Sequence, residues 1–76
     1  MNIFIEEVLA GAHMSNQLRC TDEAGGTVWV LHPVTSTDSF VQLRVEGDRV
    51  KAWTWSGWMY DISSANGSIL SQTFVK

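Results

Sequence analysis

The residues best suited to chemistry are aromatic and lie close together, in the order Trp53, Trp55, Trp58 and Tyr60. Such rings stack on nucleic-acid bases for about 1–3 kcal/mol each, and tryptophan and tyrosine are enriched among the energetic hot spots of protein interfaces. They also dominate the cores of small domains. The sequence leaves two interpretations open: a binding surface, which Phe40 joins, or a packed core.

A second group of side chains could support catalysis, but its spacing matches no known catalytic arrangement. Cys20 with His13 or His32 could form a thiolate–imidazole pair. No glycine elbow or orienting third residue accompanies them, so a buried thiol and ordinary histidines are favoured. Asp61 falls by strand parity on an otherwise apolar face, where a carboxylate needs a partner, and a structural role is favoured over a site role. We therefore predict no catalytic residues and a protein that is not an enzyme.

Metal and cofactor sites are not expected either. The two histidines and the cysteine lack the paired close spacing of a zinc site. Acidic residues in the segment 46–48 do not follow the twelve-residue calcium-loop pattern. The glycine pair at 25–26 precedes a predicted strand instead of joining a strand to a helix, so it is no phosphate cradle.

Charge and composition limit the partners. Eight acidic and five basic residues give a net charge of −3, which disfavours nucleic acid because phosphate binding needs a clustered positive field. No apolar stretch is long enough for a membrane span, and we expect neither a membrane association nor a secretory signal. A single cysteine, which excludes an internal disulfide, then predicts a cytoplasmic protein. These properties are typical of small bacterial accessory or mobile-element proteins.

The segment 1–12 is predicted to be a helix. Its apolar residues recur at helical spacing and form one stripe opposite Glu6 and Glu7; the stripe is Phe4, Ile5, Val8, Leu9 and Ala12. The alternative is a strand in which Ile3 and Ile5 share one face. Residues 17–20 form at most a short, weak strand.

The rest of the chain predicts strands over 27–32, 40–45, 50–55, 58–62 and 69–75, all within one domain, 1–76. Turn residues at 46–49, 56–57 and 66–67 divide the last four strands into an antiparallel meander. A two-residue turn at 56–57 sets Trp55 opposite Trp58 and Trp53 opposite Tyr60. An even-length loop at 66–67 then places Phe74 on the Met59 side.

This register predicts two apolar faces on one sheet. One face is aliphatic, and the other is largely aromatic, consisting of Phe40, Trp53, Trp55, Trp58, Tyr60, Ile62, Ile69 and Val75. One short helix covers only one face, so the strand with Trp29 and the segment 17–20 must help to cover the other. Any part of the aromatic face that they leave uncovered is available for an interface.

We therefore predict an α+β, mainly β, fold: a short N-terminal helix packed on a bent antiparallel meander of about five strands, with closure into a small barrel as a variant. We predict that the protein is a small, non-enzymatic interaction protein that forms a homodimer and binds another protein. The predicted binding residues are Phe40, Trp53, Trp55, Trp58 and Tyr60. A binding module for a small apolar or carbohydrate ligand is the alternative. A minimal enzyme that uses Cys20, His32 or Asp61 is a third, less favoured.

Overall fold

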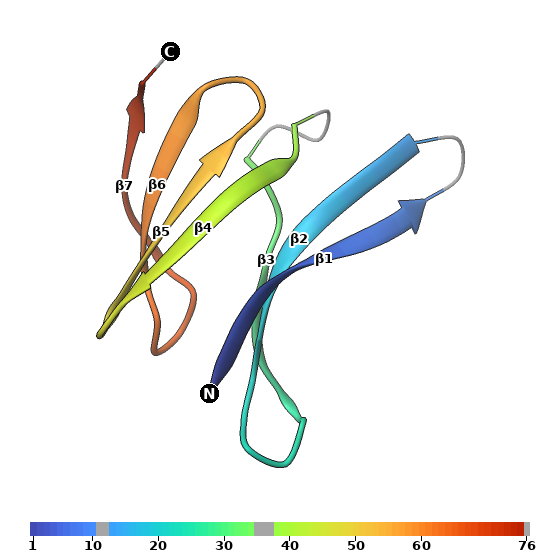
Figure 1. Cartoon of the computed structure of the whole chain (residues 1–76), viewed down its shortest axis with the longest axis vertical. Coiled ribbons are helices and arrows are strands. Elements are labelled where there is room, and N and C mark those ends of the chain that lie inside the picture. The colour runs from blue at the N-terminus through green and yellow to red at the C-terminus, as the bar shows by residue number, and fades with distance from the viewer. Residues whose placement is uncertain (11–12, 35–37, 76) are drawn as a thin grey trace.

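The computed structural model describes residues 1–10, 13–34 and 38–75, with the side chains of 8–10 and 13–15 not included. The described chain forms two antiparallel sheets (Figure 1). The first is three-stranded, in the order β1-β2-β3, with β1 Asn2–Ala10, β2 His13–Thr21 and β3 Thr27–Leu31. The second is a four-stranded meander, with β4 Phe40–Glu46, β5 Arg49–Thr54, β6 Trp58–Ser63 and β7 Ile69–Phe74.

The α+β prediction is wrong, because the predicted N-terminal helix is a strand. Residues 2–10 form β1, which pairs with β2 from Asn2↔Thr21 to Ala10↔His13 without a break in register; residues 11–12 lie outside the described part of the chain. Ile3 and Ile5 pack against the core, whereas Phe4 is exposed. The β-branched residues at alternating positions favour this outcome, and the helical stripe was coincidental.

The meander predicted for the second half of the chain is present, and the antiparallel sheet is confirmed. The pairs Val45↔Val50 and Leu43↔Ala52 also agree with the predicted register. The register between β5 and β6 is wrong by one residue. The turn contains three residues, 55–57, and the pairs are Trp53↔Met59 and Ala52↔Tyr60.

Gly57 explains the longer turn. Its φ of 104° lies in the region that glycine adopts without steric cost, and its N–H donates to the Thr54 carbonyl at 3.1 Å. A three-residue hairpin loop that ends in such a residue is a common alternative to the two-residue turn. Because side chains alternate along a strand, the extra residue moves Tyr60 and Ile62 to the opposite face from that predicted.

Two β-bulges change the faces further. Pairing shifts between Phe40 and Gln42, so that Phe40 lies opposite Thr54 and Val41 is left over. A second shift on β7 leaves out Leu70 and places Phe74 opposite Trp58, on the Tyr60 side. A bulge adds one unpaired residue to one strand and reverses the parity beyond it.

The prediction of two apolar faces on the four-stranded sheet is therefore wrong. The outward face of β4–β6 carries ion pairs: Arg49 contacts Asp61 at 3.0 Å, and Glu46 lies 3.5 Å from Arg44 and 3.7 Å from Lys51. One polar face and one apolar face are typical of antiparallel sheets.

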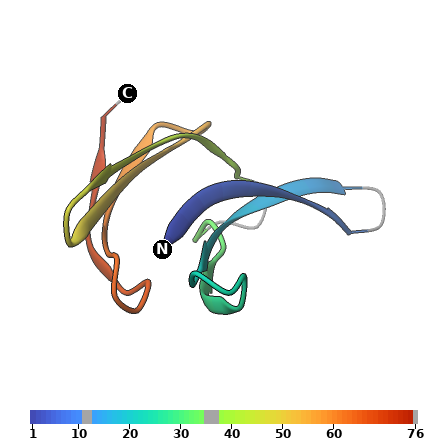
Figure 2. The same ribbon diagram turned by 60° about the horizontal axis from the view of Figure 1, so that its bottom comes forward.

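The core lies between the two sheets. Its fully or nearly buried residues come from both, namely Leu18, Cys20, Trp29, Phe40, Val50, Ala52, Tyr60 and Ile62. Phe40 meets Tyr60 edge to face, with ring centroids 5.8 Å apart. The sheets are inclined to each other and stay open (Figure 2), so the barrel is also excluded.

Polar groups join the sheets where their edges approach. The Asn16 side chain donates to the Phe40 carbonyl at 2.8 Å and accepts from the Phe40 N–H at 2.7 Å, as a neighbouring strand would. The Trp29 indole donates to the Ser64 carbonyl at 2.9 Å, and the Val34 N–H donates to the Tyr60 hydroxyl at 3.1 Å. These bonds satisfy polar groups that the core would otherwise leave buried and unpaired.

Gly67 is expected to be harder to replace than Gly47, another turn glycine with a positive φ. It combines a φ of 76° with contact to Trp29, because a Cβ there would lie 2.7 Å from the indole ring. Gly47→Ala is the matched control, since Gly47 has a φ of 62° and open space around it. Each alanine adds about 1–2 kcal/mol of backbone strain, and only Gly67→Ala must also displace Trp29. Urea unfolding should show a clearly larger loss of unfolding free energy for Gly67→Ala than for Gly47→Ala. Equal losses would contradict the close contact between Gly67 and Trp29.

Candidate interaction surface along β7

The structure separates the five aromatic residues predicted to share one binding face. Phe40 and Tyr60 are core residues, each 2% exposed. Trp53 lies half-buried on the outward face, in register with Gln42 and Met59. Trp55 is in the β5–β6 turn and is 73% exposed, and half-buried Trp58 starts β6. The predicted aromatic face is thus divided among core, outward face and turn.

A different apolar surface runs along β7. All six residues of β7 are exposed, and the exposed fractions of Leu70 and Phe74 are 50% and 55%. Trp58 contacts Phe74, with ring centroids 5.3 Å apart. The β7 surface, as we call it, consists of Trp55, Trp58, Ile69, Leu70, Phe74 and Val75.

The difference in width between the two sheets explains why the three-stranded sheet does not cover β7. Core residues of the four-stranded sheet come from β4, β5 and β6, and none comes from β7. Strands lie about 4.8 Å apart, and the three-stranded sheet faces the part of its partner next to β4, to which β1 and β2 lie closest. The surface was not predicted from the sequence because Phe74 was placed on the Met59 side and Ile69 and Val75 were placed on the aromatic face, which divided the β7 residues between two faces.

The turn at one end of this surface is held by Asp38. This carboxylate accepts from the N–H groups of Ser39 and Ser56 at 2.9 and 3.1 Å and from the Ser56 hydroxyl at 2.5 Å. The Trp55 N–H donates to the Ser39 carbonyl at 2.9 Å, and Val75 donates to the Gly57 carbonyl at 2.8 Å. The turn that presents Trp55 is therefore fixed to both the β3–β4 connection and the end of β7.

Opposing effects act on the pKa of Asp38. Burial of the side chain raises the pKa, but the hydrogen bonds from Ser56, Thr54 and Ser39 stabilise the carboxylate and bring the pKa below its ordinary value of 3.8. Asp38 is thus a structural anion that stabilises the turn when it is ionised.

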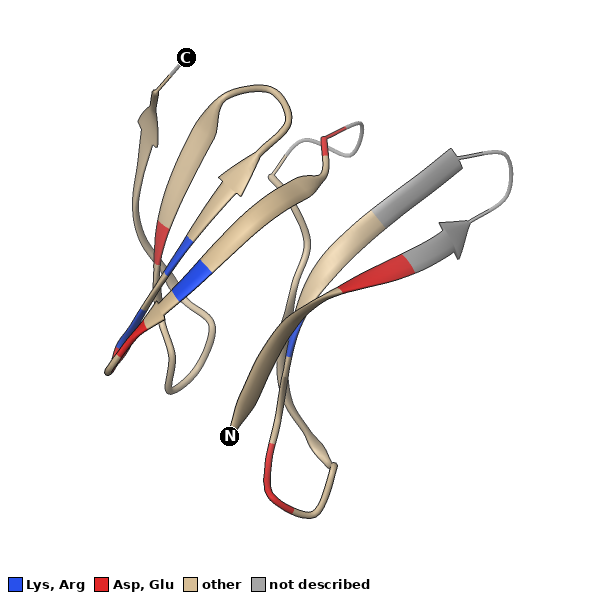
Figure 3. Ribbon diagram, in the orientation of Figure 1, with Lys and Arg blue, Asp and Glu red and all other residues tan. Residues whose placement is uncertain are grey.

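Charge distinguishes the two edges of the four-stranded sheet (Figure 3). The β4 edge carries Arg44 and Glu46, whereas the segment 69–75 contains no charged residue. Charged side chains on edge strands normally block pairing with other chains. The β7 edge lacks that protection.

The residues considered for catalysis lie apart. Cys20 is fully buried; burial raises the pKa of its thiol, and the thiol contacts the Met1 sulfur at 3.1 Å. A buried thiol with a raised pKa is a poor nucleophile. His32 is exposed, the His13 side chain is outside the described part, and Asp61 lies on the outward face beside Arg49. The predicted apolar setting of Asp61 is wrong, since its strand partners there are Lys51 and Ser71.

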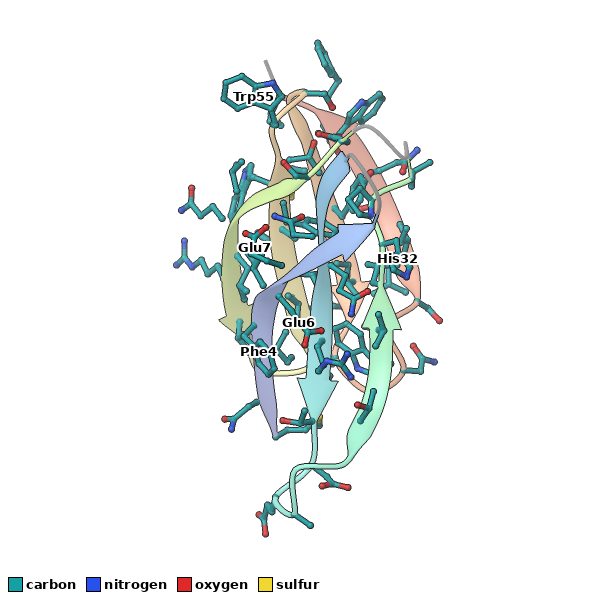
Figure 4. The ribbon with its side chains drawn as sticks, turned by 90° about the vertical axis from the view of Figure 1, so that its right-hand side faces the viewer. Phe4, Glu6, Glu7, His32 and Trp55 are labelled. Atoms are coloured by element: carbon teal, nitrogen blue, oxygen red, sulfur yellow. The ribbon has the colours of Figure 1, made fainter. Side chains whose placement is uncertain are left out.

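A polar cluster on the three-stranded sheet lies away from the β7 surface. Glu6 accepts from Gln17 at 2.8 Å and from Arg19 at 2.7 Å, and these bonds lower its pKa. Figure 4 shows Glu6 and Phe4 on one face of this sheet and Trp55 at the far end of the molecule. The hydrogen-bond donors to the Glu6 carboxylate are the side chains of Gln17 and Arg19, so the cluster has a structural role.

Comparisons with known proteins give no match: no family model, no curated protein and no solved structure is similar to this chain. Within the described ranges, no three acidic, histidine or cysteine side chains come together as metal ligands. The same ranges include no helix that is long and apolar enough to cross a membrane.

Asp38→Asn is expected to destabilise the protein by about 2 kcal/mol at pH 7, the scale of hydrogen bonds to a charged group. A lowered folded-state pKa means that the Asp38 contribution is complete above about pH 4 and is lost as pH falls through that lower value. The difference in unfolding free energy between wild type and Asp38→Asn should therefore shrink on acidification. Glu23→Gln, in an exposed loop, is the control and should leave the free energy of unfolding at pH 7 nearly unchanged. A constant difference from pH 7 to pH 3 would contradict this role.

Proposed function

We propose that this chain is a small non-enzymatic interaction protein that binds a protein partner through the β7 surface. The proposal rests mainly on one observation: every residue of β7 is exposed, although the strand is uncharged and contains Ile69, Leu70 and Phe74. Exposed apolar side chains gathered on one strand, with the Trp58–Phe74 pair at one end, are the kind of surface that marks interaction sites in soluble domains.

The composition of the surface supports a protein partner. Trp55 and Trp58 provide large side chains of the type enriched at interface hot spots. Phe74 packs edge to face on Trp58, and the turn behind Trp55 is fixed by Asp38. A surface held in place before binding loses less conformational entropy when the partner arrives.

Photo-crosslinking at the β7 surface tests this function. Benzoylphenylalanine in place of Phe74 should give a discrete protein adduct on irradiation in the cells that produce the chain. The same group in place of Phe4, which is exposed on the other sheet, is the matched control and should give at least fivefold less adduct. Equal adducts at both positions, or none at position 74, would refute a protein-binding β7 surface. A tryptophan fluorescence shift with small apolar ligands and no adduct would favour the ligand-binding alternative.

A further inference from the structure

The free edge of β7 presents main-chain groups as well as side chains. β7 is the last strand of its sheet, in the order β4-β5-β6-β7. Val75 donates its N–H to Gly57, toward β6. Successive residues of a strand direct their N–H and C=O groups to opposite sides, so those of Phe74 and Gln72 point away from β6. An edge of this kind pairs with an added strand.

The residue sequence of β7 indicates which kind of strand would pair with its free edge. The segment 69–75 reads Ile-Leu-Ser-Gln-Thr-Phe-Val, with two apolar residues at each end and three polar residues in the middle. In an antiparallel pair centred on Gln72, Leu70 at the bulge lies opposite Phe74 of a second copy, whereas Ile69 and Val75 lie on opposite faces of the sheet, because the bulge reverses the parity of Ile69. Ser71 then faces Thr73, and Gln72 faces Gln72. The apolar contact across the pair is thus made by Leu70 and Phe74, which flank the polar centre.

A two-fold axis is compatible with this register. An axis perpendicular to the sheet at Gln72 pairs like faces over the regular segment 71–74, because Ser71 and Thr73 are an even number of positions apart and Gln72 meets its own copy. The Gln72 N–H and C=O point outward, so the central pair forms two main-chain hydrogen bonds. No charges oppose each other across the axis, since 69–75 has none. The bulge at Leu70 lies at the end of the pairing and leaves residues 71–74 in regular register with β6.

The remaining described edges are less suited to this pairing. β4 carries Arg44 and Glu46 and lies against the first sheet. β3 pairs regularly with β2 only from Trp29 to Leu31, and Pro33 follows it. β1 carries Glu6 and Glu7 in mid-strand. Among these edges, only β7 combines exposure, neutrality and a self-complementary sequence.

We propose that the partner at the β7 surface is a second copy of this chain, joined by antiparallel β7–β7 pairing about a two-fold axis at Gln72. This inference depends on the proposed function and specifies its partner. The product is one continuous eight-stranded sheet in which each Phe74 covers Leu70 of the other copy. Isologous pairing of this kind closes after two copies and leaves no free β7 edge.

Charge substitution at the axis tests the pairing. Gln72→Lys and Gln72→Glu each place like charges opposite one another in the homodimer, and each should raise the dimer dissociation constant at least tenfold in sedimentation experiments. An equimolar mixture of the two variants should restore dimers, because the lysine of one copy then meets the glutamate of the other. The same substitutions at Gln42, a glutamine exposed on the other edge strand β4, are the matched controls and should leave the dimer unchanged.

The outcomes distinguish the inference from the proposed function. Wild-type dimers that survive both Gln72 substitutions would overturn β7 pairing, and so would a mixture that fails to restore dimers. A wild type that stays monomeric at millimolar concentration would overturn the inference as well. The proposed function would still stand if crosslinking at position 74 captured a different protein, and it would fail if that position captured none.

Discussion

The three-residue turn between β5 and β6 is the constraint on which the faces of this protein depend. Gly57 closes the turn with a backbone conformation available chiefly to glycine, and Asp38 holds it through Ser56. With that spacing, Tyr60 and Ile62 point into the core and Met59 and Asp61 point out. A turn shorter by one residue would bury Asp61 and expose Tyr60. One residue in a loop therefore decides which face of β6 packs into the hydrophobic core.

The sequence predicts where the strands of the meander lie but not which way their side chains point. Alternation and the turn dipeptides were sufficient for strands near 40–45, 50–55, 58–62 and 69–75. The orientation of Phe40 and Phe74, however, depends on bulges at Val41 and Leu70, which are tertiary adjustments with no clear local signal. The N-terminal strand was missed for a related reason: its stability comes from pairing with residues 13–21, not from its own periodicity.

The two sheets differ in size, and this difference leaves one strand of the larger sheet exposed. Three strands cover the core side of β4, β5 and β6 and leave β7 uncovered. Most of the predicted aromatic site was absorbed into the core or its margin, where Phe40 and Tyr60 pack together. The exposed surface is therefore made mainly of aliphatic residues and Phe74, with Trp55 and Trp58 at one end. A chain of this length buries only part of its apolar surface, which makes a partner an energetically reasonable addition.

The side chain of Asn16 has a consequence for how the two sheets behave as one body. It supplies both the donor and the acceptor that the main chain of Phe40 requires. Among side chains, only a carboxamide offers both groups in this planar arrangement; aspartate would present two acceptors to a carbonyl, and leucine would present nothing. At this point the junction between the sheets depends on one residue type, which adds a strand-like pair of hydrogen bonds to the apolar core and to the bonds made by Trp29 and Tyr60.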